Sequence, residues 1–153
     1  MIKTYNMKQE YTYWLALANA ENIYTRRKNE ILAKIHEDNS SLAHFFTEEN
    51  NWKNRFNLSQ DEIQSLLQEK EKLNNYSFIV EDLLEQGYQI IPIFSSDYPK
   101  TLKRNLKFSS PILLYAYGNI ELLNKESVAI VGSRNANDTS LNFTDNIASL
   151  SVS

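Results

Sequence analysis

The segment 128–132 constrains the fold of this chain more than any other. It reads Val-Ala-Ile-Val-Gly, so its first four residues are apolar and three of them are β-branched. This composition is typical of a strand that is buried on both faces. Both faces of a strand are covered when helices pack on either side of a parallel sheet. The segment therefore predicts an α/β fold with a parallel sheet, in which residues 128–131 form one strand.

The residues that follow this predicted strand are suited to an anion. Gly132 permits a sharp turn, and Ser133 and Arg134 come directly after it. A strand that turns at Gly-Ser into a helix start gathers free backbone N–H groups, and an arginine adds a planar set of donors for phosphate oxygens. We predict that these three residues hold a phosphate. Two alternatives stay open: Arg134 can pair with a carboxylate at the end of the sheet, and Ser133 can cap the following backbone.

Residues 11–86 have the apolar spacing of helices. Ser59 and Glu62 form a capping box, in which the serine oxygen accepts from the N–H of residue 62 and the glutamate reaches back. Gly87 supplies a stop for the last of these helices. The pattern predicts that residues 1–86 form a small helical bundle, the first of two domains.

From Gly87 the pattern changes to that of an α/β domain over residues 87–153. Its predicted elements are strands at 89–94, 111–117 and 128–131, a helix after Pro99, a helical turn at 120–123, and a last helix capped by Asp138 or Thr139. This order is the opening of a Rossmann-like parallel sheet. Such a sheet needs about five or six strands and about 120 residues, whereas about 65 residues follow Gly87. We therefore expect an incomplete sheet and a truncated chain.

The charge of the chain is distributed unevenly. The net charge is −3, but residues 95–134 hold six Lys or Arg against three Asp or Glu. This local excess permits a site for a polyanion. Four basic residues in this region recur at helical spacing and are candidate contacts to a polyanion such as DNA; they are Lys100, Lys103, Arg104 and Lys107. A helix face that is simply solvated is the commoner explanation of such a pattern. Four aromatic residues can stack on unpaired bases or belong to the core; they are Tyr98, Phe108, Tyr115 and Tyr117.

The sequence holds no pattern typical of a catalytic or metal site. Cysteine is absent, and His36 and His44 have no partner at metal-ligand spacing. We find no serine nucleophile motif, no histidine base beside a nucleophile and no paired carboxylates on a site loop. No apolar stretch approaches the roughly 20 residues of a membrane span, and the N-terminus lacks the apolar core of a signal peptide. These patterns favour a cytoplasmic binding protein without membrane contact, metal or catalytic residues.

Four pieces of the sequence together resemble one bacterial family. They are residues 13–17 (Tyr-Trp-Leu-Ala-Leu), Tyr98-Pro99 with Leu102, residues 111–115 (Pro-Ile-Leu-Leu-Tyr) with Gly118-Asn119, and residues 128–134. In these pieces and their order, the chain resembles the DNA-processing proteins of the DprA (Smf) family, which protect incoming single-stranded DNA during transformation. The resemblance extends over nearly the whole chain and corresponds to the front half of a typical member.

The resemblance implies a helical N-terminal domain of the sterile-alpha-motif or helix-hairpin-helix kind, joined to a Rossmann-like domain. It also implies binding of single-stranded DNA, loading of the RecA recombinase and formation of a homodimer, with no catalytic turnover and no cofactor. Carried over to this chain, Gly132, Ser133 and Arg134 fall on the turn that holds DNA phosphates. The family usually continues with a hydroxyl residue and a Tyr-Gly pair, whereas residues 135–140 here read Asn-Ala-Asn-Asp-Thr-Ser.

Two other functions stay open. A phosphoribohydrolase-like fragment of the lysine-decarboxylase-like group would also bind a nucleotide phosphate where a strand ends at Gly-Ser. Its later glycine-rich motif with a catalytic glutamate is not in this sequence. The other hypothesis is that the chain is a non-functional remnant, or that only its helical module, residues 1–86, folds and contacts a partner protein.

Overall fold

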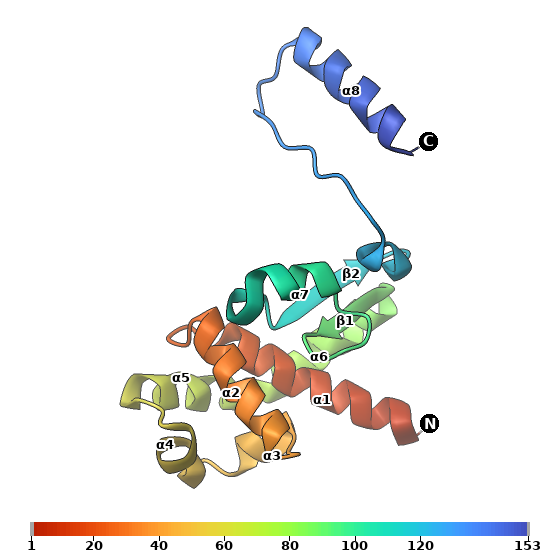
Figure 1. Ribbon diagram of the computed structural model, residues 1–153. Helices are drawn as coiled ribbons and strands as arrows, with labels where there is room; N and C mark the ends of the chain where they lie inside the picture. Colours follow the sequence, from red (N-terminus) through yellow and green to blue (C-terminus); the bar gives the residue numbers. More distant parts are fainter. Residues whose placement is uncertain (1, 153) are drawn as a thin grey trace.

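The computed structural model describes the backbone of residues 2–152 and the side chains of residues 8–150. Helices make up most of the first half, and two strands follow them (Figure 1). The elements are, in chain order, α1 (Ile2–Asn19), α2 (Thr25–Glu37), α3 (Leu42–Thr47), α4 (Asn50–Phe56), α5 (Gln60–Glu71), α6 (Leu73–Glu85), β1 (Tyr88–Pro92), α7 (Lys100–Leu106), the 3-10 helix η1 (Lys107–Ser109), β2 (Leu113–Tyr117), the 3-10 helix η2 (Ile120–Asn124) and α8 (Asp138–Val152). Within the part described, no helix has both the length and the apolar content needed to cross a membrane.

The predicted helical region is confirmed, and so are its local signals. The Ser59 hydroxyl accepts from the N–H of Glu62 at 3.2 Å, and the Glu62 carboxylate accepts from the N–H of Ser59 at 2.7 Å. Gly87 follows the end of α6 with a φ of 84°, a conformation that glycine adopts without a steric penalty. One cap was not predicted: the Ser41 hydroxyl accepts from the N–H of His44 at the start of α3.

Aromatic rings fill the centre of the helical region. Phe45 packs against Phe46, Trp52 and Phe56 with ring centroids 4.9–5.5 Å apart. The Trp52 indole N–H donates to the backbone oxygen of Phe45 at 2.8 Å, so this buried polar atom is satisfied. These rings bury most of their surface, and we expect them to supply much of the stability of the helices.

One buried carboxylate joins α5 to α6. Glu69 lies in the interior and accepts from the hydroxyl of Tyr76 and, at 2.8 Å, from the ammonium of Lys72. Burial and the hydrogen bond to Glu69 raise the pKa of Tyr76 above its usual range. The Lys72 side chain is about half exposed, so water continues to solvate that end of the pair.

The hydrophobic core continues from the helices into residues 87–124. Buried residues of both parts form one cluster; those after α6 are Ile90, Ile91, Ile93, Tyr98, Ile112 and Leu113. The Asn29 side chain on α2 makes the polar connection between the two parts. Its amide nitrogen donates to the backbone oxygens of Thr25, Phe108 and Ser110 at 3.0, 2.9 and 2.8 Å. The amide of Asn29 therefore holds the segment around η1 against α2.

The expected parallel sheet is not seen among residues 2–152, and that prediction was wrong. Strands β1 and β2 lie where strands were predicted, but they pair antiparallel, with Tyr88 opposite Tyr117 and Pro92 opposite Leu113. The backbone pairing continues outward, because the N–H of Ile93 donates to the oxygen of Ile112 at 3.0 Å. Residues 93–112 join the two strands through α7 and η1, and the end of β1 lies beside the start of β2, because Pro92 is opposite Leu113. The chain therefore re-enters the sheet beside the point at which it left.

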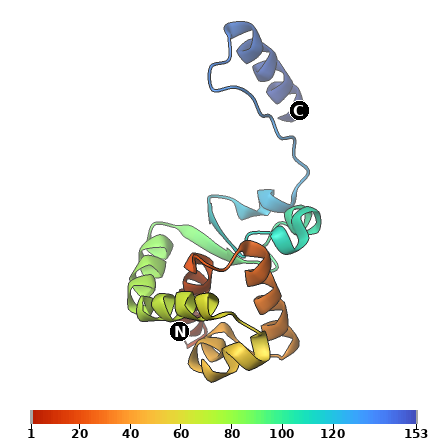
Figure 2. The same ribbon diagram turned by 90° about the vertical axis from the view of Figure 1, so that its left-hand side faces the viewer.

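The predicted third strand is also wrong in this structure. Residues 125–137 leave the body as an extended, exposed segment that ends in α8 (Figures 1 and 2). Val131, for example, is 92% exposed. A strand requires a neighbouring strand for its backbone hydrogen bonds, and in the described residues no strand lies beside this segment. The last helix is confirmed, but its cap is Asn137 rather than Asp138 or Thr139, because the Asn137 side chain accepts from the N–H of Ser140 at 2.9 Å.

Candidate nucleic-acid interface

The three residues predicted to hold a phosphate lie on the exposed segment between η2 and α8. Gly132 does not adopt a positive φ, and a methyl group there would meet no described atom within 4 Å. The turn comes at residues 134–135. The Ser133 hydroxyl accepts from the N–H of Asn135 at 3.2 Å. Ser133 therefore caps the following backbone, which was the alternative role predicted for it. The residues are adjacent and open to solvent, but they do not lie at the end of a buried strand.

The guanidinium of Arg134 is exposed and close to no described carboxylate. Among the described side chains, no Asp or Glu oxygen lies within 4.0 Å of it. The alternative role predicted for Arg134, an ion pair with a carboxylate at the end of the sheet, is thus not seen in the part described. The Arg134 guanidinium carries five N–H donors, and within the described residues no hydrogen bond from them is seen, so they can meet an incoming anion.

The four basic side chains between positions 100 and 107 do not lie together on one exposed helix face. The ammonium of Lys103 donates to the backbone oxygen of Ile93 at 2.9 Å and lies 5.2 Å from the ring centroid of Phe94. Lys107 directly follows the last residue of α7 and is the first residue of η1, where its backbone turns away from the helix direction. Lys103 and Lys107 therefore border the same hollow, which Lys100 and Arg104 do not line.

The four aromatic candidates also separate. Tyr98 belongs to the core: it is buried, its hydroxyl donates to the backbone oxygen of Pro111 at 2.7 Å, and burial raises its pKa. Tyr115 and Tyr117 are exposed on β2, and the ring of Tyr117 lies 5.3 Å from that of Tyr88. Phe108 is about half exposed and lines the hollow beside Lys103 and Lys107.

This hollow, called the Phe94–Phe108 hollow below, has a volume of about 290 Å³. Its lining comes from α2, from α7 and from the segments on either side of α7; the residues are Asn29, Ala33, Ile93, Phe94, Lys103, Lys107 and Phe108. Sequence reasoning did not single out Phe94, because a phenylalanine after Ile90, Ile91 and Ile93 matches the apolar run of a strand. Only the packing shows that its ring remains 42% exposed.

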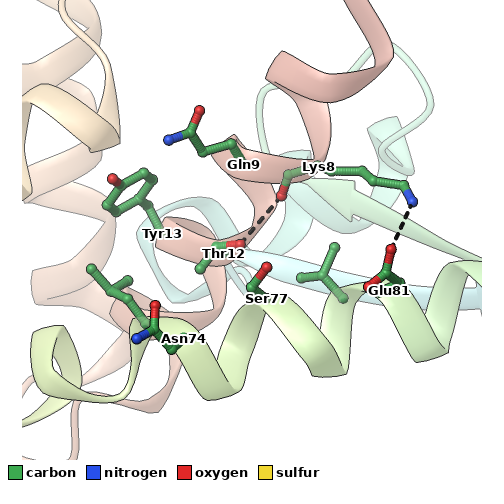
Figure 3. A pocket seen from close by; sticks show the side chains of 9 residues that line it. Lys8, Gln9, Thr12, Tyr13, Asn74, Ser77 and Glu81 are labelled. Atoms are coloured by element: carbon green, nitrogen blue, oxygen red, sulfur yellow. Dashed lines mark hydrogen bonds and ion pairs between the residues drawn. The ribbon is translucent and has the colours of Figure 1, made fainter. Parts of the chain in front are cut away.

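A second hollow of about 440 Å³ lies between α1 and α6 (Figure 3). Its lining is mostly polar and includes Thr12 and Ser77. Its cation is already paired, because the ammonium of Lys8 lies 3.5 Å from the carboxylate of Glu81. The Thr12 hydroxyl likewise donates to the backbone oxygen of Lys8 at 3.3 Å. This hollow offers an anion less than the Phe94–Phe108 hollow does.

No group of three or more histidines, aspartates or glutamates able to hold a metal ion occurs among the described residues. The exposed segment presents a cation and backbone amides, and the Phe94–Phe108 hollow presents two lysines and two aromatic rings.

Comparison with known proteins finds one match, in the second half of the chain. Residues 89–152 match the family model described as DNA recombination-mediator protein A. The matched region includes β2, the Phe94–Phe108 hollow apart from its α2 residues, the exposed segment and α8. No curated protein and no solved structure matches the chain. The region 89–152 of this chain thus matches the family of DNA recombination-mediator protein A, the same DprA family that the sequence resembles.

Proposed function

We propose that this chain binds single-stranded DNA through its sugar–phosphate backbone, as a DNA-processing protein of natural transformation. The observation that carries the proposal is the exposed Arg134, which has no carboxylate partner in the described part and lies inside the family-matched region. An arginine fork can donate two parallel hydrogen bonds to one phosphate. Gly132 and Ser133 lie directly before it and leave room for a phosphate to approach the backbone.

The proposal extends to the partners that the family resemblance implies. We propose that the DNA-bound form helps to load the RecA recombinase, that copies of the chain associate as homodimers, and that the protein acts in the cytoplasm. The function is one of binding, without catalysis or a cofactor. The family match over residues 89–152 supports these statements.

Replacing Arg134 with alanine should weaken binding to a labelled single-stranded oligonucleotide by about tenfold at low salt, because it removes one charge-assisted contact. Each phosphate contact releases about 0.7 counterion from a single strand, so the slope of log K against log salt should become shallower by about that amount. Fluorescence anisotropy over a range of salt concentrations measures both quantities.

The matched control is Arg26→Ala, which removes an exposed arginine from α2, outside the family-matched region. It should leave affinity and salt slope within about twofold of the original protein. Equal binding by the Arg134→Ala variant and the original would contradict the assignment of the phosphate site. Release of free base from a nucleoside monophosphate would point instead to the phosphoribohydrolase alternative.

A further inference from the structure

The Phe94–Phe108 hollow combines two half-exposed aromatic rings with two lysines. Phe94 is held in place by two other rings, because His36 stacks on it with ring centroids 4.9 Å apart and Trp14 contacts it edge-on at 6.2 Å. Its ring is therefore a fixed flat surface rather than a loose side chain. Phe108 is 49% exposed, and Asn29 fixes its backbone through the hydrogen bond to its oxygen. The Phe94 ring and the Phe108 backbone are thus held beside a space of about 290 Å³.

The two lysines give this hollow a positive rim. The Lys103 ammonium donates one of its three hydrogens to the backbone oxygen of Ile93, and its positive charge lies beside the ring of Phe94. Lys107 lies on the same rim, and its ammonium has no ion-pair partner among the described residues. An apolar, aromatic floor under a cationic rim fits a flat ring that is attached to an anionic chain.

The backbone conformation of Lys107 is strained, and this is an independent observation in favour of a functional role for the rim. Lys107 has a φ of 51° and a ψ of −123°. Side chains other than glycine rarely occupy this region, and strain of this kind is concentrated at functional sites. A glycine would fold more easily at this position but would carry no charge to the rim.

We infer that the Phe94–Phe108 hollow takes one unpaired base of single-stranded DNA, stacked on the phenyl rings, with a neighbouring phosphate on Lys107. The inference rests on the proposed function for the identity of the ligand. Stacking on an aromatic ring accepts any base, because every base has a π-face. The body of the protein would thus hold a base, while the exposed segment with Arg134 holds a phosphate elsewhere on the same strand.

The test compares an oligothymidylate with an oligomer of equal length in which abasic spacers replace the bases. Phe108→Leu keeps an apolar side chain but removes the π-face. It should weaken binding of the oligothymidylate by about fivefold or more and leave binding of the abasic oligomer within about twofold. The control Phe78→Leu changes a phenylalanine that is 71% exposed on α6, away from the hollow, and should change neither affinity.

Lys107→Gly provides a readout that a merely structural lysine would not give. Because the glycine relieves the strained backbone, the variant should melt at a higher temperature than the original protein. It should nevertheless bind both oligomers less tightly, by about threefold to tenfold, because the contact to a phosphate is lost. Affinity and stability that rise together in this variant would overturn the role of Lys107.

The outcomes separate this inference from the proposed function. If the original protein discriminates in favour of bases but Phe108→Leu behaves identically, the hollow is not the base site, and single-stranded DNA binding stands. If the original binds neither oligomer, the proposed function fails. In that case, thymidine 5′-monophosphate is titrated while the NMR signals of His36 and Phe108 are followed: saturable shifts support a base site, and unchanged signals overturn it.

Discussion

Replacing Asn29 with aspartate should lower the free energy of unfolding by about 3–5 kcal/mol at neutral pH, because a carboxylate would face three carbonyl oxygens in a buried site. The amide nitrogen of Asn29 donates to the oxygens of Thr25, Phe108 and Ser110, and the residue is only 6% exposed. A carboxylate has no hydrogen to donate.

The folded state would raise the pKa of the new carboxyl above its unfolded value of about 3.9. The loss should therefore be smallest below that pH, should grow as the pH rises above it, and should level off above the folded pKa. Urea denaturation at acidic and neutral pH measures it.

The control for this substitution is Asn75→Asp, an exposed asparagine in the first turn of α6. A negative charge near a helix N-terminus is tolerated or slightly favourable, so this change should stay within about 0.5 kcal/mol of the original. Asn29→Ala should lie between the two, at about 1–3 kcal/mol, because it loses the donors without adding a charge. A loss for Asn29→Asp that does not depend on pH would show that the amide does not face these carbonyls in solution.

Replacing Glu69 with alanine should cost about 2–4 kcal/mol of unfolding free energy, because it leaves the buried hydroxyl of Tyr76 without its acceptor and opens a cavity between α5 and α6. The full cost of breaking a buried ion pair does not apply, because the Lys72 side chain is about half exposed and can turn towards water. Thermal or denaturant unfolding followed by circular dichroism measures the change.

A double-mutant cycle isolates the hydrogen bond between Glu69 and Tyr76. Tyr76→Phe should recover part of the loss in the Glu69→Ala background, and the coupling should be about 1–2 kcal/mol. Glu69→Gln keeps an acceptor and should cost less than the alanine change. Glu71→Ala removes an exposed glutamate from the same helix and should have an effect below about 0.5 kcal/mol. A coupling near zero would mean that the phenol finds another partner.

Local signals in the sequence predicted the local structure well. The capping box at Ser59 and Glu62 involves residues three apart, so its geometry follows from the chain itself. The stop at Gly87 needs only one left-handed residue. The positions of β1 and β2 follow from runs of apolar side chains. These features depend on neighbours along the chain and can be predicted without knowledge of the packing.

The direction and number of strands could not be predicted in the same way. A run of apolar residues marks a strand but does not say which neighbour it pairs with, and residues 128–131 form no strand in the described structure although their composition is that of a buried one. The candidate site has the same limit. Helical spacing placed Lys103 with Lys100 and Arg104, whereas contacts with Ile93 and Phe94 take Lys103 to the hollow. Those contacts join residues about ten positions apart through the turn after β1.

The exposed segment after η2 has a consequence for calorimetry. The fully buried core ends at Leu113, and residues 125–137 remain exposed. Heat-capacity change and denaturant dependence both scale with the surface that unfolding exposes. At roughly 12–15 cal/mol/K per residue, the first 124 residues account for about 1.5–1.9 kcal/mol/K, against about 1.8–2.3 kcal/mol/K for a fully packed chain of 153 residues. A scan of this protein should therefore return a heat-capacity step below that of a fully packed chain.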